Sequence, residues 1–313
     1  MNTTLLRVAA ATCLVVSIVS IVSSQTVAQP KTLQALVDHA AGTTVAKFAD
    51  KNLSQNDLAI TLIDMRDPAR PVTASFRGNE KIYPASVVKL FFLVAVHRWL
   101  EDKKIEDTPE LRRALKDMIV DSYNEATHYV VDVVTHTTSG YELPAKEMEE
   151  WQFKRNAVNR YFSSLGYTNI NVNQKTHCED AYGRERVSRQ GGQNRNKLTT
   201  DATARLMMEI VTSKAVTPAR SLQMMELLKR DHSKKTNDPD SQDTGYTGPA
   251  LPPGTKYWAK AGWTSTTRHD AAYIELPTGE KFVLVTFTER HSNDRDVIPT
   301  VARVIVEGLK NVK

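Results

Sequence analysis

Apolar residues recur every three to four positions along most of this chain, a spacing typical of amphipathic helices. The helices predicted from this spacing cover residues 32–52, 109–120, 125–134, 146–165, 200–212, 218–230 and 296–310. A further helix is predicted from Ser86 onward, where the residues are apolar almost without interruption up to Val96. A helix that is apolar on every face is a buried one, so we expect this helix to lie inside the protein.

Strand-like runs lie near both ends of the chain. Residues 58–65 and 72–76 are rich in β-branched and apolar residues and flank a turn at Asp67–Pro71, so we expect a β-hairpin. Three more runs, at residues 255–265, 271–276 and 281–288, follow near the carboxyl end. Strands at both ends that enclose a helical middle predict an α+β fold, with one sheet lobe and one inserted helical lobe.

Two long segments show no periodic pattern. Residues 169–197 are polar and contain several Gly, Asn, Gln and Arg residues, and residues 231–253 are rich in Asp, Gly and Pro. A loop as long as the first is uncommon inside a compact domain and is often functional. We find no internal repeat and no low-complexity segment.

The first 28 residues resemble an export signal. One positive charge, at Arg7, precedes an apolar run over residues 8–22, and small residues follow. This arrangement is typical of a secretory signal peptide that is cleaved after Ala28 or, alternatively, after Ser24. The other interpretation is a membrane anchor, but the run is short for a spanning helix and contains Ser. We therefore expect a periplasmic or secreted protein with no stable membrane anchor.

The rest of the chain is predicted to form one domain over residues 29–313. Its sheet lobe would combine residues 29–76 and 214–313, and its helical lobe would cover residues 77–213. The composition, 41% hydrophobic and 25% charged, is that of a soluble globular enzyme. The net charge of +5 is not gathered in one basic tract, so we expect no nucleic-acid partner. Only Cys178 remains once the leader is removed, which predicts a domain without an internal disulfide.

The first candidate for chemistry is Ser86 with Lys89 three residues later. On a helix these two positions share a face, so Lys89 can reach the Ser86 oxygen. A lone ammonium among apolar neighbours is expensive to bury, and burial lowers the pKa of a lysine, which frees an amine to take a proton from serine. The competing interpretation is a capping serine followed by a lysine that extends to solvent.

Two further motifs follow along the chain. Ser122-Tyr123-Asn124 lies where one predicted helix ends and the next begins, a place where side chains can point into a cleft. Lys260-Ala261-Gly262 lies inside the predicted strand 255–265. A glycine within a strand commonly marks close approach by a ligand or by another part of the backbone.

In this order the three motifs resemble the S-x-x-K, S-D-N and K-T-G set of class A serine β-lactamases and penicillin-binding proteins. Leu251–Gly254 is similar to the family's approach to the third motif, and Thr199-Thr200 is similar to the pair that follows the family's active-site loop. The resemblance extends over most of the mature chain. It implies the serine β-lactamase/DD-transpeptidase fold, with an active site between the two lobes.

The resemblance also implies a role for each matching residue. Ser86 would be the nucleophile that forms an acyl-enzyme, and Lys89 would help to deprotonate it. Ser122 would pass a proton to the leaving nitrogen, with Lys260 beside it, and Asn124 would position Lys89 and the substrate amide. The backbone N–H groups of Ser86 and Trp263 would form an oxyanion hole. The other substrate contacts implied are Ala261, Gly262, Trp263, Thr264, Ser265 and Arg268, with His269 as an alternative source of charge.

Three departures from the family pattern stand out. Tyr123 replaces the aspartate of S-D-N, and Ala261 replaces the hydroxyl residue of K-T-G. The E-x-x-L-N motif, whose glutamate activates the deacylating water in class A β-lactamases, is missing. The acids of the corresponding loop are Glu179, Asp180 and Glu185, of which we take Glu179 as the candidate general base. An insertion near residues 135–150 lengthens the helical lobe.

The sequence therefore predicts an exported, monomeric serine β-lactamase that acts on a small-molecule substrate. A penicillin-binding peptidase that cleaves D-Ala-D-Ala-like peptides is the first alternative, and a sensor module that stays acylated is the second. The residues His177–Asp180 include metal-ligand types, but consecutive residues rarely converge on one ion, so we expect no metal and no cofactor.

Overall fold

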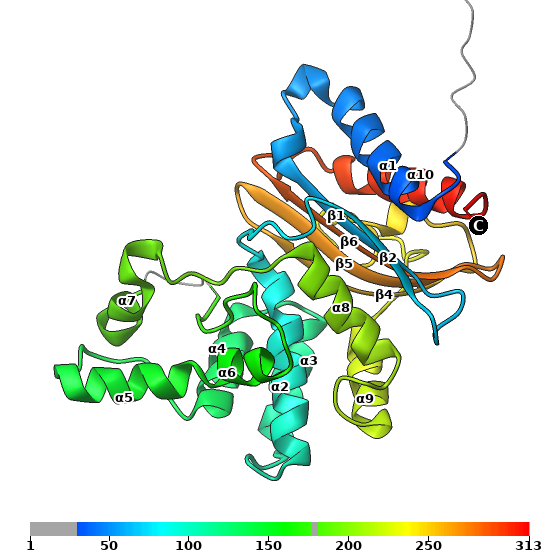
Figure 1. Cartoon of the computed structure of the whole chain (residues 1–313). Helices are drawn as coiled ribbons and strands as arrows, with labels where there is room; N and C mark the ends of the chain where they lie inside the picture. The colour runs from blue at the N-terminus through cyan, green and yellow to red at the C-terminus, as the bar shows by residue number, and fades with distance from the viewer. Residues whose placement is uncertain (1–29, 177–180, 313) are drawn as a thin grey trace, which may run out of the picture.

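The computed structural model describes residues 30–176 and 181–312. The predicted leader and Glu179, with its neighbour Asp180, lie outside these residues. The protein is built around a six-stranded antiparallel sheet with the strand order β2-β1-β6-β5-β4-β3 (Figure 1). The strands are β1 (Leu58–Asp64), β2 (Val72–Phe76), β3 (Lys229–Arg230), β4 (Lys256–Trp263), β5 (Thr267–Glu275) and β6 (Lys281–Glu289).

Helices cover both faces of the sheet. The two terminal helices, α1 (Leu33–Lys47) and α10 (Val297–Leu309), pack together on one face. The other helices are α2 (Lys89–Glu101), α3 (Pro109–Ile119), α4 (Asn124–Thr135), α5 (Ala145–Arg155), α6 (Ala157–Ser164), α7 (Gly183–Arg189), α8 (Thr200–Val211) and α9 (Pro218–Leu228). Among them α8 lies directly against β1, β5 and β6, and α2 packs against α3, α4, α6, α8 and α9 (Figure 1). The α+β architecture predicted from the sequence is confirmed.

The sheet separates two hydrophobic cores. Along β6, Val283 and Val285 face the core on the α2 and α8 side, whereas Phe282 and Leu284 face the core beneath α1 and α10. Because side chains alternate across a strand and both faces are covered, the central strands are apolar at nearly every position. This explains why the strand signal at the chain ends is continuous rather than alternating.

Several helices begin where the sequence provides a cap. The side chains of Thr32, Thr108, Thr199 and Thr217 each accept a hydrogen bond from a backbone N–H three residues later, which satisfies a donor that has no partner within the helix. Thr199, part of the pair noted in the sequence, therefore fixes the start of α8 on the sheet.

Several of the predicted elements differ in the structure, and the predicted helix 218–230 ends at Leu228, since Lys229 and Arg230 form β3. The predicted helix 146–165 is broken at Asn156 into α5 and α6, because the Asn156 side chain accepts hydrogen bonds from Asn159 and Asn173. The predicted loop 169–197 contains the short helix α7. Strand β5, which lies between β4 and β6, begins at Thr267 rather than at residue 271, since its polar start is buried and paired with β6. The predicted boundary between the lobes stays a prediction, although α8 lies on the sheet rather than apart from it.

Candidate active site

Ser86 lies in a short 3₁₀ turn, Ala85–Val88, immediately before α2. The expected first turn of an α-helix is thus a tighter turn, in which positions three residues apart are still aligned. Ala85 has a φ of 46°, a left-handed conformation that is uncommon for a residue with a Cβ atom and that often occurs at functional sites. The turn packs against β4 and β5, so the sheet supports the serine directly.

Gly262 of β4 allows this close packing. A Cβ atom at this position would lie 2.7 Å from the backbone nitrogen of Ser86 and 2.9 Å from that of Val87. The close approach expected from a glycine within a strand is therefore present, and the approaching group is the backbone of the Ser86 turn. The glycine also leaves space in front of the Ser86 N–H group, one of the two donors assigned to the oxyanion hole.

Replacing Gly262 with alanine is expected to slow acylation of the protein by a β-lactam roughly 10²-fold, because the added methyl group displaces an oxyanion donor. The same clash should lower the free energy of unfolding by about 1–3 kcal/mol. Rapid-mixing mass spectrometry and urea unfolding measure the two effects. Gly42→Ala is the matched control: nothing lies within 4 Å of the added Cβ atom in α1, so this variant should be slightly more stable and equally fast. An acylation rate for Gly262→Ala equal to that of the wild type would contradict the assignment.

His269 of β5 fixes the segment just before Ser86. The backbone N–H of Thr288 donates to Nδ1 of the imidazole, so Nε2 carries the proton and donates to the carbonyl of Tyr83 at 2.9 Å. Complete burial lowers the pKa of His269 to about 4, which keeps the ring neutral near neutral pH. His269 is therefore a support for the serine turn and not the source of positive charge considered from the sequence.

Lys89 and the Ser122 motif meet in the interior. Lys89 is fully buried, and its ammonium donates to the carbonyl of Ser122 at 2.6 Å and to the side-chain oxygen of Asn124 at 2.9 Å. The carbonyl of Tyr123, 3.4 Å from the ammonium, is a further acceptor. The link between α3 and α4, where Ser122 has a φ of 60°, turns these groups toward Lys89.

The Ser122 hydroxyl lies between two lysines. Its oxygen is 3.3 Å from Nζ of Lys89 and 3.0 Å from Nζ of Lys260. Lys260 is also fully buried, on β4. Burial, together with the nearby cations Lys89 and Arg230, holds the pKa of Lys260 well below its usual range, although Asp270 opposes the shift. The arrangement can move a proton to or from the Ser122 oxygen.

A cavity of about 1070 Å³ opens over these groups. Ser86, Ser122 and Asn124 line it, together with the last three residues of β4, Ala261 to Trp263. Residues of the segment from the end of α9 to Asp243 also line the cavity. The three motifs predicted from the sequence therefore converge on one cavity between the sheet and the helices.

The other predicted substrate contacts lie differently. The Thr264 side chain accepts hydrogen bonds from two backbone N–H groups and closes the turn between β4 and β5, and the Ser265 carbonyl accepts a hydrogen bond from Ser292. Arg268 is buried, its guanidinium donates to Asp240, and none of these three predicted residues lines the cavity. The predicted contact between Arg268 and a substrate carboxylate is thus not favoured, because a loop already occupies this side chain.

Ala261 also has a local explanation. Its methyl group belongs to a small buried apolar cluster with Tyr246 and Ile298. A hydroxyl at this position would lie against that apolar cluster, where a polar group without a partner is costly. The alanine at this position therefore fits the apolar cluster that packs behind the strand.

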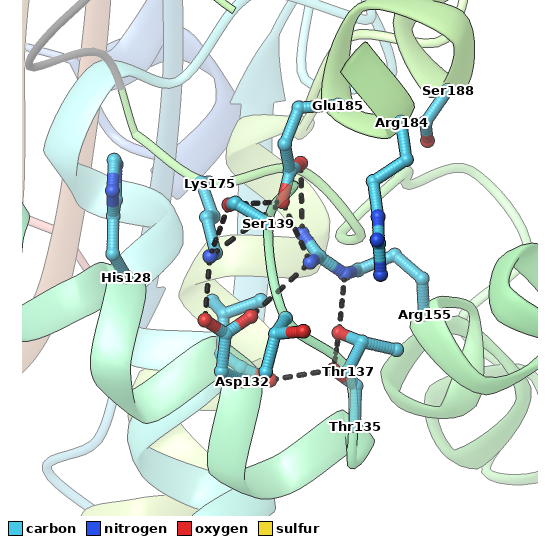
Figure 2. A network of polar contacts seen from close by, with 12 residues as sticks. His128, Asp132, Thr135, Thr137, Ser139, Arg155, Lys175, Arg184, Glu185 and Ser188 are labelled. Carbon is cyan, nitrogen blue, oxygen red and sulfur yellow. Dashed lines mark hydrogen bonds and ion pairs between the residues drawn. The ribbon is translucent and has the colours of Figure 1, made fainter. Parts of the chain in front are cut away.

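Of the candidate general bases in the predicted loop 169–197, Glu185 can be placed in the structure and Glu179 cannot. Glu179 lies outside the described residues. Glu185, in the first turn of α7, is part of the buried network in Figure 2: its carboxylate accepts two hydrogen bonds from Arg155 at 2.8 and 3.1 Å. Lys175 donates to Asp132 at 2.6 Å in the same network. This engagement of Glu185 with Arg155 favours a structural role for Glu185, which joins α7 to the end of α5.

Glu185→Gln is expected to lower the free energy of unfolding by about 3 kcal/mol, because it leaves the Arg155 guanidinium buried beside a neutral amide. Burial alone would raise the pKa of Glu185, but the cations Arg155 and Lys175 hold it below its usual range. The stabilisation is therefore present above the pKa of an unfolded glutamate and is lost as the pH falls through the lowered value. Thermal unfolding at neutral and acid pH should show the difference between wild type and variant shrinking in acid.

The exposed Glu149 of α5 provides the control for this change, since Glu149→Gln removes the same charge where nothing is buried. Its stability should match that of the wild type at both pH values. A Glu185→Gln variant as stable as Glu149→Gln would show that the ion pair with Arg155 contributes nothing.

Two residues near Lys260 were not predicted from the sequence. Gln242, from the polar segment 231–253, accepts a hydrogen bond from Nζ of Lys260 at 2.6 Å. Arg230, on β3, is buried and donates to the carbonyl of Ile119 at the end of α3. Neither residue lies in a motif, and a glutamine within a polar loop carries no local signal of this contact.

Comparisons with known proteins agree with this architecture. The model of the beta-lactamase enzyme family matches residues 100–309. No curated protein matches the sequence. Solved structures that resemble the fold include the β-lactamase from Sphaerobacter thermophilus DSM 20745, with a TM-score of 0.64, 18% identity, and coverage of 88% of this chain and 98% of that one.

Two further structures are similar. PBP-A has a TM-score of 0.62 and 16% identity over 90% of this chain and 99% of its own, and the TLA-1 extended-spectrum β-lactamase has a TM-score of 0.62 and 16% identity over 87% and 99%. At these identities the likeness establishes the fold. The family resemblance and the fold predicted from the three motifs are confirmed.

Proposed function

Because the chain belongs to the beta-lactamase enzyme family, we propose that it is a serine hydrolase that opens β-lactam rings through an acyl-enzyme on Ser86. The matched residues begin at 100, after Ser86 and Lys89, so the assignment of the nucleophile rests on the geometry of the cavity. The observation that carries the proposal is the Ser122 hydroxyl between Lys89 and Lys260, in the cavity that Ser86 also lines.

Each step of the proposed acylation has a candidate group. Lys89, as its amine, takes the proton of Ser86 while the serine oxygen attacks the carbonyl carbon of the lactam. The N–H groups of Ser86 and Trp263 stabilise the oxyanion. When the carbon–nitrogen bond breaks, the Ser122 hydroxyl gives its proton to the leaving nitrogen and recovers one from a neighbouring lysine. Hydrolysis of the ester by water then restores Ser86.

A second candidate is a penicillin-binding peptidase that cleaves D-Ala-D-Ala-like peptides with the same groups. The observation that favours it is the position of Glu185, which is paired with Arg155 and leaves the family's deacylating base without an evident counterpart among the described acids of the loop. The similarity to PBP-A is consistent with either function. The two candidates differ in how fast water removes the acyl group from Ser86.

We also propose that the protein acts outside the cytoplasm, on the basis of its amino-terminal 28 residues. In the parts of the chain that the structure describes, no helix has the length and apolar character needed to cross a membrane.

Intact-mass spectrometry with a penicillin and a chromogenic cephalosporin tests the proposed function. Substrate loss with a transient adduct is expected for a β-lactamase, and Glu179→Gln should then make the adduct persist. A stable adduct without turnover would favour the peptidase, and release of D-alanine from a D-Ala-D-Ala peptide would establish it. If no adduct forms and no substrate is lost, the proposed chemistry is wrong.

A further inference from the structure

Gln242 connects two parts of the candidate site. Its side-chain oxygen accepts hydrogen bonds from Nζ of Lys260 at 2.6 Å and from the backbone N–H of Ala261 at 3.1 Å. Its side-chain nitrogen donates to the carbonyls of Ile119 at 3.1 Å and Val120 at 2.8 Å. One amide therefore joins the edge of β4 to the end of α3, two residues before Ser122.

These partners fix the orientation of the Gln242 amide. Both groups at its oxygen, an ammonium and a backbone N–H, can only donate, and both groups at its nitrogen are carbonyls that can only accept. If the amide were rotated by 180°, its nitrogen would face the two donors and its oxygen would face the two carbonyls, so all four hydrogen bonds would be lost. The set of four contacts is consequently specific to an amide: a carboxylate could accept from Lys260 but could not donate to the two carbonyls, and an apolar side chain could do neither.

The loop that presents Gln242 is itself held from the sheet. Arg268 of β5 donates to Asp240 at 2.6 Å and to the carbonyl of Gly245 at 2.7 Å, and its guanidinium lies 4.0 Å from the ring of Tyr246. Arg295, before α10, donates to the same Asp240 carboxylate. Contacts on both sides of Gln242 in the sequence thus keep it at the cavity wall, which it lines.

We infer that Gln242 is a positioning residue, which holds the Lys260 ammonium against the Ser122 hydroxyl and keeps α3 and β4 at the separation that proton transfer requires. This inference rests on the proposed function, because it assigns Gln242 a part in the acylation of Ser86. The inference also assigns a role to Arg268, because its contacts with Asp240 and Gly245 hold the loop that carries Gln242 at the cavity wall.

The charges around Lys260 determine what a change at Gln242 does. Lys89 on α2 and Arg230 on β3 oppose its positive charge, Asp270 on β5 supports it, and burial disfavours it. The amide of Gln242 adds an acceptor without adding a charge. A carboxylate in its place would favour the charged form of Lys260, whereas an apolar side chain would remove the acceptor and favour the neutral form.

Gln242→Glu and Gln242→Met test the inference by changing Lys260 in opposite directions. The acylation rate by a chromogenic cephalosporin should fall at high pH as Lys260 loses its proton. This alkaline limb is expected to move up by about one pH unit or more in Gln242→Glu and down in Gln242→Met. Lysine labelled with ¹³C at Cε reports the titration of Lys260 directly by NMR, with Lys260→Met to identify its signal.

Gln34→Glu is the matched control, because Gln34 is an exposed residue of α1 on the other face of the sheet. Its alkaline limb and its Lys260 signal should coincide with those of the wild type. Thermal unfolding of each variant verifies that it is folded before its titration is interpreted.

The outcomes separate the two proposals. If the wild type is acylated and neither the limb nor the Lys260 signal moves in folded Gln242→Glu and Gln242→Met, the inference is wrong and the proposed function stands. If the Lys260 signal moves in opposite directions but no protein is acylated, Gln242 holds Lys260 as inferred and the proposed function is wrong. Movement of both in the expected directions supports both.

Discussion

Replacing Ser86 with alanine is expected to abolish the covalent adduct with a penicillin and to lower the rate of β-lactam hydrolysis roughly 10⁴-fold or more. The reason is that no other group in the proposed mechanism can form the ester on which both steps depend. The change removes one partly buried hydroxyl from the turn Ala85–Val88, whose conformation is set by its packing on β4. The fold should therefore persist, and intact-mass spectrometry and a spectrophotometric assay measure the two losses.

The control for this variant is Ser163→Ala, which removes a hydroxyl from an exposed residue of α6. It should form the adduct at the wild-type rate. Peptide mapping of the wild-type adduct should place the modification on Ser86. A full adduct on Ser86→Ala would move the nucleophile elsewhere, and Ser122 would be the first residue to consider because it lines the same cavity.

Each of the three motifs carries a local signal, but their convergence on one site was predicted from their resemblance, in this order, to the family's set of motifs. Ser86 precedes a predicted buried helix, and Ser122 lies between two predicted amphipathic helices. Lys260 lies in a predicted strand whose glycine, Gly262, indicates a close approach by another group. The antiparallel sheet then places β4 beside the Ser86 turn. These signals survive in the structure because the burial of apolar side chains fixes the elements that carry them.

Other features depend on contacts between distant parts of the chain. Helix α7 is short and polar, so its sequence favours a loop, yet Glu185 at its start is held by Arg155 from α5. The polar residues Arg268 and His269 at the start of β5 have partners in a loop and in the segment just before the Ser86 turn. No pattern within a window of ten or twenty residues can show such pairings.

Gln242 shows the same limit within the site. Its segment, residues 231–253, has the composition of a solvent-exposed loop, and its contact with Lys260 depends on distant residues, among them Arg268, which holds the loop against the sheet. The sequence resemblance, in turn, assigned Arg268 to the substrate by its position near the third motif. The exposed position expected for segment 231–253 and the substrate contact expected for Arg268 are both replaced in the structure for one reason. The loop between α9 and β4 lies against the sheet and binds the Arg268 side chain.

Replacing Lys89 should have the second large effect. Lys89→Met is expected to slow acylation of Ser86 by roughly 10²- to 10⁴-fold, the usual contribution of a positioned general base. The substitution also removes the donor that the Ser122 carbonyl and the Asn124 side chain share, and the loss of these charge-assisted hydrogen bonds is expected to cost about 1–3 kcal/mol. Stopped-flow acylation and urea unfolding measure the two effects, and Lys116→Met, at an exposed position of α3, is the control.

Lys89→Arg separates the two roles that a buried lysine can have here. A guanidinium keeps the positive charge and can still donate to the Ser122 carbonyl, but it stays protonated in proteins and cannot take a proton from Ser86. We therefore expect Lys89→Arg to be more stable than Lys89→Met and acylated as slowly. Acylation of Lys89→Arg at close to the wild-type rate would mean that Lys89 acts as a fixed cation. Proton removal from Ser86 would then pass to the Ser122 hydroxyl and Lys260, which lie 3.0 Å apart.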